Sequence, residues 1–307
     1  MRYLLGNRFR GAFLGGLVGE ALLQTSQPTH PTGNNFLESL VPGVGSLIQL
    51  GKFDVDNWLE VYQQKFTHLE PSTIIFATIP ISLFFPENPV KLHQNILRIL
   101  KHWDTDLEIT DSSLALGYAI AQSLTEKLQP QTLIPQIMAF IGETNTSTTQ
   151  NLLKVNNLLQ QGAGLEKVQA ELGSPGKLSH RIAMAFYYFL SNLEDFPIAI
   201  LRSIRYDTIC LEKYDNLYLP NTSVITGVLS GVYNTTTSIT PTWRVLLTRQ
   251  LSQISQVLEL ADTLATSWSG VHQPGLTSQE FAQKEGLMSD QNLPPCVYTA
   301  PRVMGKG

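Results

Sequence analysis

The sequence has little cysteine and little charge. Its 307 residues contain two cysteines, Cys210 and Cys296, far apart in the chain. A small secreted scaffold held together by disulfides is therefore excluded, and we expect a cytoplasmic protein. Only 15% of the residues are charged, the net charge is −4, and no basic run occurs. This balance argues against nucleic acid as the main partner.

The sequence also lacks an apolar run long enough to cross a membrane. The longest candidate, "MRYLLGNRFRGAFLGGLVGEALL", is interrupted by Arg8, Arg10 and Glu20, whereas a spanning helix needs about 20 apolar residues. The run has basic residues before its apolar part, as a secretory signal does, but no clean small-x-small cleavage site follows. We therefore expect no membrane span and interpret the run as a core helix.

Alternation typical of strands is rare, and helical periodicity dominates instead. Apolar residues recur three or four apart in the segments "VDNWLEVYQQKF", "NPVKLHQNILRILKHW", "SSLALGYAIAQSLTEKL", "LIPQIMAFIGE", "NLLKVNNLLQQG", "KLSHRIAMAFYYFLSNL", "DFPIAILRSI" and "RVLLTRQLSQISQVLELADTLA". Asp54, Asp111, Ser112 and Asn221 stand where helix caps are expected. The sequence thus predicts an all-α chain.

The composition changes near the end of the chain. Residues 1–264 read as a single helical domain, while residues 265–307 are rich in Gly, Pro, Ser and Gln and predict an extended or partly disordered tail. Within it, "LPPCVYTAPRVMGKG" places large apolar groups between prolines, which restrict the backbone before docking. We expect Tyr298, Arg302 and Val303 to bind a groove on the same chain or on a partner protein.

Two helical segments carry glycines four residues apart. Gly11, Gly15 and Gly19 lie on one helix face, and Gly227 and Gly231 lie on another. Each glycine costs a helix about 1 kcal/mol relative to alanine. A close approach of the two backbones would compensate for that cost, so we expect the two faces to pack together.

The two glycine segments and a third segment between them resemble motifs of a known family. "RFRGAFLGGLVGEAL", "MAFYYFLSNLEDFPIAILRSI" and "NTSVITGVLSGVYN" resemble motifs of the ADP-ribosylglycohydrolase family, over roughly residues 8 to 263. The resemblance implies a compact orthogonal helical bundle. It also implies two Mg²⁺ ions that position ADP-ribose and a water for cleavage at the ribose C1″.

The positions where the resemblance places metal ligands carry no carboxylate. The first ligand motif falls on Asn34, Asn35 and Phe36, and the second falls on Tyr218, Pro220 and Asn221. Mg²⁺ takes hard oxygen ligands, mostly carboxylates and water. The loop that would contact the nucleotide is also changed. It falls on Pro71, Ser72, Thr73, Phe76 and Ala77, so that bulkier residues replace its glycines and Ala77 replaces its arginine. We therefore predict a catalytically degenerate protein without a metal, which serves as a protein-binding or regulatory scaffold.

An active hydrolase remains the alternative. Glu20 ends the first helix where the family has an acid, and an insert near residues 206–220 contains Asp207 and Asp215. These three carboxylates could rebuild a site for hydrolysis of N- or O-glycosidic ADP-ribosyl bonds, with Mg²⁺ as its cofactor. The competing interpretation of Glu20 is structural: a carboxylate at the end of an apolar helix is hydrogen-bonded, and its pKa rises if it is buried.

Other constellations of polar residues favour structural roles. "HWDTDLEITDSS" gathers His102, Asp104, Asp106 and Asp111 between two helices, a pattern more typical of capping than of metal binding. Cys210 has no histidine near it in sequence, and Ser46 lacks a nucleophile elbow. The sequence therefore indicates no second catalytic centre.

Overall fold

The computed structural model describes residues 5–27, 36–213, 218–251 and 253–270, all within one unit that spans Met1–Pro274. The described residues form helices and no strands, which confirms the predicted all-α class. The helices are α1 (Leu5–Ser26), α2 (Phe36–Leu50), α3 (Val55–Lys65), α4 (Pro71–Ala77), α5 (Ile79–Phe84), α6 (Pro89–His102), α7 (Leu107–Leu124), α8 (Leu133–Ile141), α9 (Ser147–Gln160), α10 (Leu165–Leu172), α11 (Leu178–Ser191), α12 (Phe196–Lys213), α13 (Thr222–Asn234), the 3₁₀ turn η1 (Thr236–Ser238), α14 (Pro241–Gln250) and α15 (Ile254–Trp268). None of the described helices is both long and apolar enough to span a bilayer.

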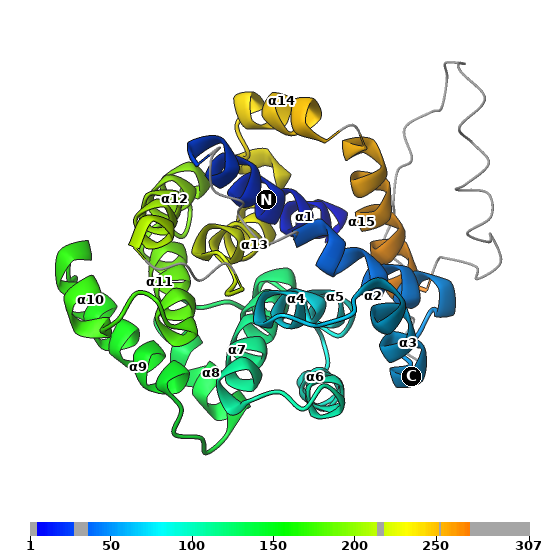
Figure 1. Ribbon diagram of the computed structural model, residues 1–307, viewed down its shortest axis with the longest axis horizontal. Helices are drawn as coiled ribbons and strands as arrows, with labels where there is room; N and C mark the ends of the chain where they lie inside the picture. The colour runs from blue at the N-terminus through cyan, green and yellow to red at the C-terminus, as the bar shows by residue number, and fades with distance from the viewer. Residues whose placement is uncertain (1–4, 28–35, 214–217, 252, 271–307) are drawn as a thin grey trace, which may run out of the picture. The chain divides into compact units, whose positions relative to one another are not determined.

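Helices α1 and α13 form the centre of the bundle, and the middle of α1 packs against α13 (Figure 1). A Cβ placed on Gly15 would lie 2.8 Å from the carbonyl carbon of Gly227 and closer still to its oxygen. Gly11 faces the Gly231 carbonyl in the same way, and Gly19 faces that of Ser223. The predicted packing of the two glycine faces is therefore confirmed, and only glycine permits so close an approach.

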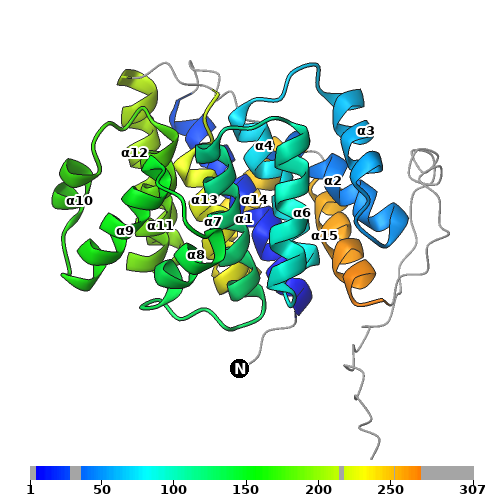
Figure 2. The same cartoon turned by 90° about the horizontal axis from the view of Figure 1, so that it is seen from below.

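The remaining helices surround this pair. Helices α7, α11 and α12 pack against α13, and α15 packs against α1 and α2 (Figures 1 and 2). Large side chains without exposed surface, among them Trp58, Tyr62, Phe13 and Phe186, fill the spaces between the helices. This burial of apolar surface is the main stabilising contribution to such a fold.

Some of the helix caps predicted from the sequence are present in the structure, and others are not. Asp54 caps α3 as predicted, accepting a 3.1 Å hydrogen bond from the N–H of Asn57. The prediction that Asp111 and Ser112 are caps is wrong, because α7 begins earlier and is capped by Asp106. Asp111 is instead buried inside α7.

Asp111 connects α7 to the start of α9. Its Oδ2 accepts hydrogen bonds from the hydroxyls of Thr144 at 2.8 Å and Thr146 at 2.6 Å. Thr146 is in turn the N-cap of α9. The carboxylate therefore fixes a helix start, but in a neighbouring helix rather than its own.

The periodic segment after Trp243 forms two helices rather than one. Helix α14 ends at Gln250, and Leu251 takes an extended conformation before α15 begins. The break lets Val257, Ala261 and Leu264 of α15 bury their side chains in the core. Helix α15 continues to Trp268, beyond the predicted start of the tail at residue 265, and the segment 271–307 with Tyr298, Arg302 and Val303 lies outside the described residues.

Candidate functional site

The described positions that the family resemblance assigns to the site lie at one end of the central helix pair. The C-terminal part of α1 and the first turns of α2, α4 and α13 converge there. Glu20 of α1 accepts a 2.8 Å hydrogen bond from the N–H of Phe36, the first residue of α2. The N–H of Ser72 in α4 donates to the carbonyl oxygen of Tyr218 at 3.1 Å. We refer to this convergence as the Glu20 end of the bundle.

Glu20 caps a helix. By accepting from the N–H of Phe36, it satisfies one of the backbone donors that α2 leaves unpaired at its start, and it places negative charge at the positive end of the helix dipole. Burial raises the pKa of Glu20 to about 7, against the lowering effect of the Phe36 bond, and Glu38 adds a smaller increase. The Phe36 hydrogen bond and the raised pKa favour the structural interpretation of Glu20.

Asp207 also caps a helix, from fifteen positions away in the sequence. Its side chain is 1% exposed on α12, and its oxygens accept from the N–H groups of Thr222 at 3.0 Å and Ser223 at 2.7 Å in the first turn of α13. Asn221 occupies the N-cap position as predicted, but its side chain accepts no capping hydrogen bond. Burial raises the pKa of Asp207, and nearby Arg181 opposes that rise.

Sequence reasoning missed Arg181, although a lone arginine in the apolar segment "SHRIAMAFYYF" was a visible signal. Arg181 is 1% exposed in α11, and its Nη1 makes long hydrogen bonds of 3.4 and 3.5 Å to the carbonyl oxygens of Leu219 and Pro220. The guanidinium therefore holds the chain just before α13 while offsetting the charge of Asp207. A buried cation and a helix start together stabilise this carboxylate.

Next to Arg181, His180 is held within the core. Its Nδ1 lies 2.7 Å from the hydroxyl of Tyr206, and the two rings are stacked. Burial lowers the pKa of His180 to about 4. The Tyr206 hydroxyl also reaches the carbonyl oxygen of Pro175 at 3.3 Å. These residues form a buried polar layer behind Asp207.

Phe36, one of the changed metal positions, is part of the hydrophobic core. It has no exposed surface, and its ring meets that of Phe76 edge to face, with 5.4 Å between the centroids. A Cβ on Gly16 would lie 2.5 Å from the Phe36 ring, so the aromatic fills the space beside α1. Two positions at which the sequence departs from the family, Phe36 and Phe76, thus pack against each other.

The remaining candidate positions differ in exposure where the structure describes them. Tyr218 is 61% exposed, whereas Pro220 and Asn221 are buried. Asn34, Asn35 and Asp215 lie outside the described residues.

Comparison with solved structures identifies the architecture. A protein described as an ADP-ribosylglycohydrolase-related protein complex matches 86% of this chain and 99% of its own, at 18% sequence identity and a TM-score of 0.61. This chain has the ADP-ribosylglycohydrolase-like fold. No protein-family model and no curated protein sequence matches it. The predicted resemblance is therefore confirmed at the level of the fold.

The residues described at the Glu20 end do not fit the Mg²⁺ ions that the fold family implies. Over the described part of the chain, no group of three His, Cys, Asp or Glu side chains lies close enough to hold a metal ion. Both oxygens of Asp207 already accept backbone N–H groups. A magnesium site needs several oxygen ligands in octahedral geometry, so we derive no chemical step through a metal.

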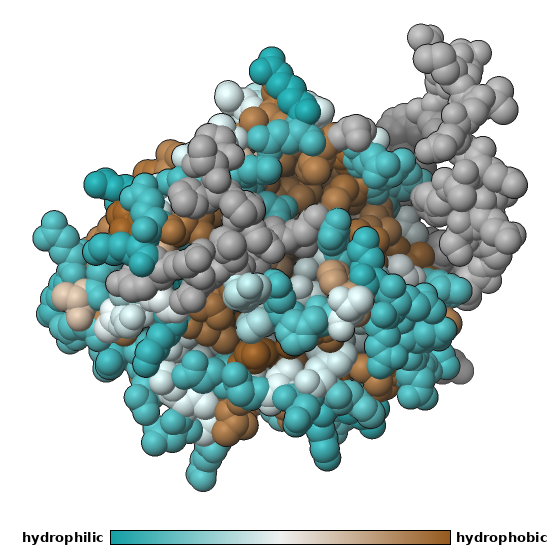
Figure 3. Space-filling model, in the orientation of Figure 1, coloured by the Kyte–Doolittle hydropathy of each residue, from teal (hydrophilic) through white to brown (hydrophobic). Residues whose placement is uncertain are grey.

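Two cavities are lined in part by residues of α1. One, of about 430 Å³, lies where α7 and α13 end and includes Arg8 and Glu126 in its wall. The other, of about 560 Å³, is an apolar groove between α1 and α14 lined by Leu22, Trp243 and Leu246. Hydrophobic surface is visible beside α14 in Figure 3.

Proposed function

We propose that this chain is a catalytically degenerate ADP-ribosylglycohydrolase-like protein that acts as a protein-binding or regulatory scaffold. The observation that supports the proposal is the use of both described candidate carboxylates as helix caps. Glu20 accepts from the start of α2, and Asp207 accepts from the start of α13. Carboxylates whose oxygens already accept backbone hydrogen bonds are poor ligands for a metal and poor contacts for a substrate.

The chemistry of glycosidic cleavage explains why this matters. Hydrolysis at a ribose carbon needs a group that activates water and fixed negative charge near the developing oxocarbenium ion. Asp207 is 1% exposed and cannot reach a substrate unless the start of α13 moves. Phe36 and Phe76 further favour a filled core at this end over an open pocket.

The alternative is an ADP-ribosyl hydrolase that uses Glu20, Asp207 and Asp215. One feature favours it: burial raises the pKa of Glu20 to about 7, which suits a general acid or base near neutral pH. Mg²⁺ would then require Asp215 and neighbouring residues, which lie outside the described part of the chain. We rank this function second because Asp207 is already committed to α13.

The proposed partner of the scaffold is another protein in the cytoplasm. The tail supports this choice, since Tyr298 is a large apolar group between Pro295 and Pro301, Val303 follows Pro301, and Arg302 adds positive charge. Aromatic and arginine side chains are the residues that most often anchor protein interfaces.

A hydrolysis assay with matched variants tests the proposal. Purified full-length protein is incubated with Mg²⁺ and proteins that carry N- or O-linked ADP-ribose, beside its Glu20→Gln and Asp207→Asn variants. We expect no release of ADP-ribose above that of the variants. Titration calorimetry with Mg²⁺ is expected to show no saturation at one or two ions per chain. Release by the wild type that both variants abolish would replace the scaffold with the hydrolase.

A further inference from the structure

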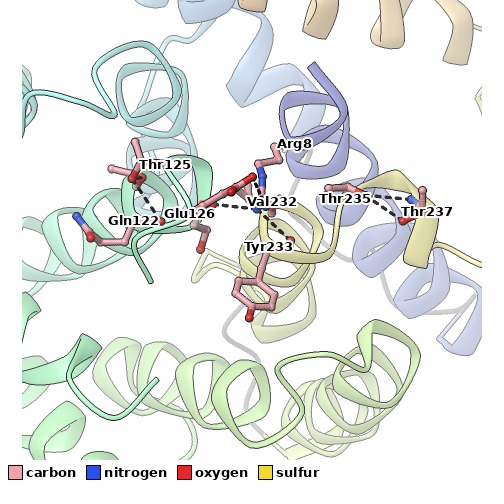
Figure 4. A network of polar contacts seen from close by, with 10 residues as sticks. Arg8, Gln122, Thr125, Glu126, Val232, Tyr233, Thr235 and Thr237 are labelled. Carbon is pink, nitrogen blue, oxygen red and sulfur yellow. Dashed lines mark hydrogen bonds and ion pairs between the residues drawn. The ribbon is translucent and has the colours of Figure 1, made fainter. Parts of the chain in front are cut away.

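The opposite end of the α1–α13 pair carries a second polar network, centred on Arg8 (Figure 4). Arg8 Nη1 donates to the carbonyl oxygens of Ser123 at 2.9 Å and of Val232 and Tyr233 at 3.1 Å each. Its Nη2 forms an ion pair with Glu126 at 3.2 Å. One guanidinium therefore binds the last turns of α7 and α13 together.

The two helix ends explain why a cation is buried here. The last carbonyl groups of a helix have no partner within it, and its dipole gives that end a partial negative charge. Helices α7 and α13 bring two such ends together. Arg8, whose side chain is 9% exposed, places its donors on these carbonyls and on Glu126. The positive charge of Arg8 is thus matched by the negative ends of the two helices and by Glu126.

A cavity of about 430 Å³ opens beside this network, and Arg8 and Glu126 form part of its wall. Its volume lies within the range of about 300–1,000 Å³ typical of small-molecule sites. Glu194, Tyr233 and Asn234 line the rest of the polar surface. The Nη groups of Arg8 already donate hydrogen bonds to the helix ends. A ligand in the cavity would therefore contact mainly Glu194, Tyr233 and Asn234.

The polar groups offered by those residues are mostly hydrogen-bond acceptors. Glu194 forms no ion pair or hydrogen bond with any residue that the structure describes. Asn234 uses its amide nitrogen to donate to Leu193 at 2.7 Å and Ser230 at 3.1 Å, so its oxygen remains to accept. Burial, and next to it the charge of Glu194, raises the pKa of Tyr233.

We propose that this cavity binds a small organic cation that carries a primary ammonium or guanidinium group. Such a group has only donors and a positive charge. It would face the Glu194 carboxylate, the Asn234 oxygen and the ring of Tyr233, whose face attracts cations. An anion would face two carboxylates, of which Arg8 compensates one. The proposal does not depend on the scaffold function, because Arg8 and Glu20 lie roughly 18 Å apart along α1, at 1.5 Å per residue.

Three compounds of similar size test the site. The full-length protein is titrated calorimetrically with 1,4-diaminobutane, with neutral 1,4-butanediol and with the dianion succinate. We expect saturable binding of one diamine per chain and at least tenfold weaker binding of the other two. Equal binding of diamine and diol, or no binding of the diamine, would overturn the proposal.

Matched variants locate the binding. Glu194→Gln removes one negative charge from an exposed position in the cavity wall. Glu166→Gln removes one negative charge from an exposed position in α10. We expect Glu194→Gln to weaken diamine binding at least tenfold and Glu166→Gln to leave it unchanged. Equal affinities for the two variants would mean that the diamine binds elsewhere. A parallel titration with Nα-acetyl-lysine amide distinguishes a lysine side chain of another protein from a free diamine as the source of the ammonium group.

Discussion

Asp207 in α12 accepts a 2.7 Å hydrogen bond from the backbone N–H of Ser223 in the first turn of α13. The bond joins two helices that a loop separates in sequence, and its acceptor is fully enclosed by protein. A carboxylate here stabilises the start of the central helix, and this start is where the fold family would place its metal. In the hydrolase that we rank second, this one side chain would have to serve both the helix start and catalysis.

We predict that Asp207→Ala destabilises the protein by at least about 2 kcal/mol, because it leaves two buried N–H donors without an acceptor. Urea unfolding followed by circular dichroism measures the loss. Asp195→Ala is the matched control, since Asp195 caps α12 at an exposed position with a 3.0 Å bond to Ile198. Water can replace that cap, so its loss is smaller. Equal losses for both variants would show that burial adds nothing to the Asp207 cap.

The raised pKa of Glu20 predicts a pH-dependent stability. Its folded-state pKa of about 7 lies above the unfolded value of 4.5, so the stability it contributes is present below pH 4.5 and is lost as pH rises through about 7. The loss is at most about 3 to 4 kcal/mol, at about 1.4 kcal/mol per pKa unit. Relative to the wild type, Glu20→Gln should be more stable at about pH 8 than at about pH 5.

Urea unfolding of both proteins at the two pH values measures this difference. Glu166→Gln on α10 controls for the loss of one negative charge at an exposed position. If Glu20→Gln follows the wild type at both pH values, the carboxylate titrates alike in the folded and unfolded chain, and burial does not govern it.

A glycine in the contact between α1 and α13 and a glycine outside that contact should respond oppositely to substitution. Gly227→Leu inserts a side chain against the carbonyl group of Gly15 and should cost about 1 to 3 kcal/mol or more through overpacking. Gly45→Ala in α2 is the control, because a Cβ there would meet no atom within 4 Å, and it should gain up to about 1 kcal/mol from helix propensity. Thermal melts compare the two. A Gly227→Leu melt equal to that of the wild type would contradict the close packing of α1 and α13.

Local patterns in the sequence predicted the helices and the central contact. Spacing of apolar residues identifies an amphipathic helix without knowledge of its neighbours, and glycines four apart mark the face that another backbone approaches. The cap of α3 was equally local, since Asp54 directly precedes the helix it serves. These features depend on residues a few positions apart, which is why sequence reasoning reached them.

The candidate site depends on pairings that the sequence does not display. Asp207 pairs with α13, Asp111 with the start of α9, and Arg8 with helix ends more than a hundred residues away. Nothing near Asp207 in sequence distinguishes a buried cap from a catalytic acid. Only the packing of α12 against α13 decides its surroundings, and packing is a property of the whole chain.

The tail gives the last prediction. Deleting residues 290–307 removes Tyr298 and Val303, two apolar residues close to prolines in the sequence. Proline restricts the backbone torsions open to a free chain, which reduces the entropy that such a segment loses on docking. We expect affinity capture from cell extract to lose specific proteins that the full chain recovers, and the single change Tyr298→Ala to lose the same ones. Val90→Ala, at a 65% exposed position in α6, removes a similar apolar group elsewhere and should retain them. Melting temperatures establish that each variant is folded, and an unchanged set of captured proteins after the deletion would show that the tail is dispensable for binding.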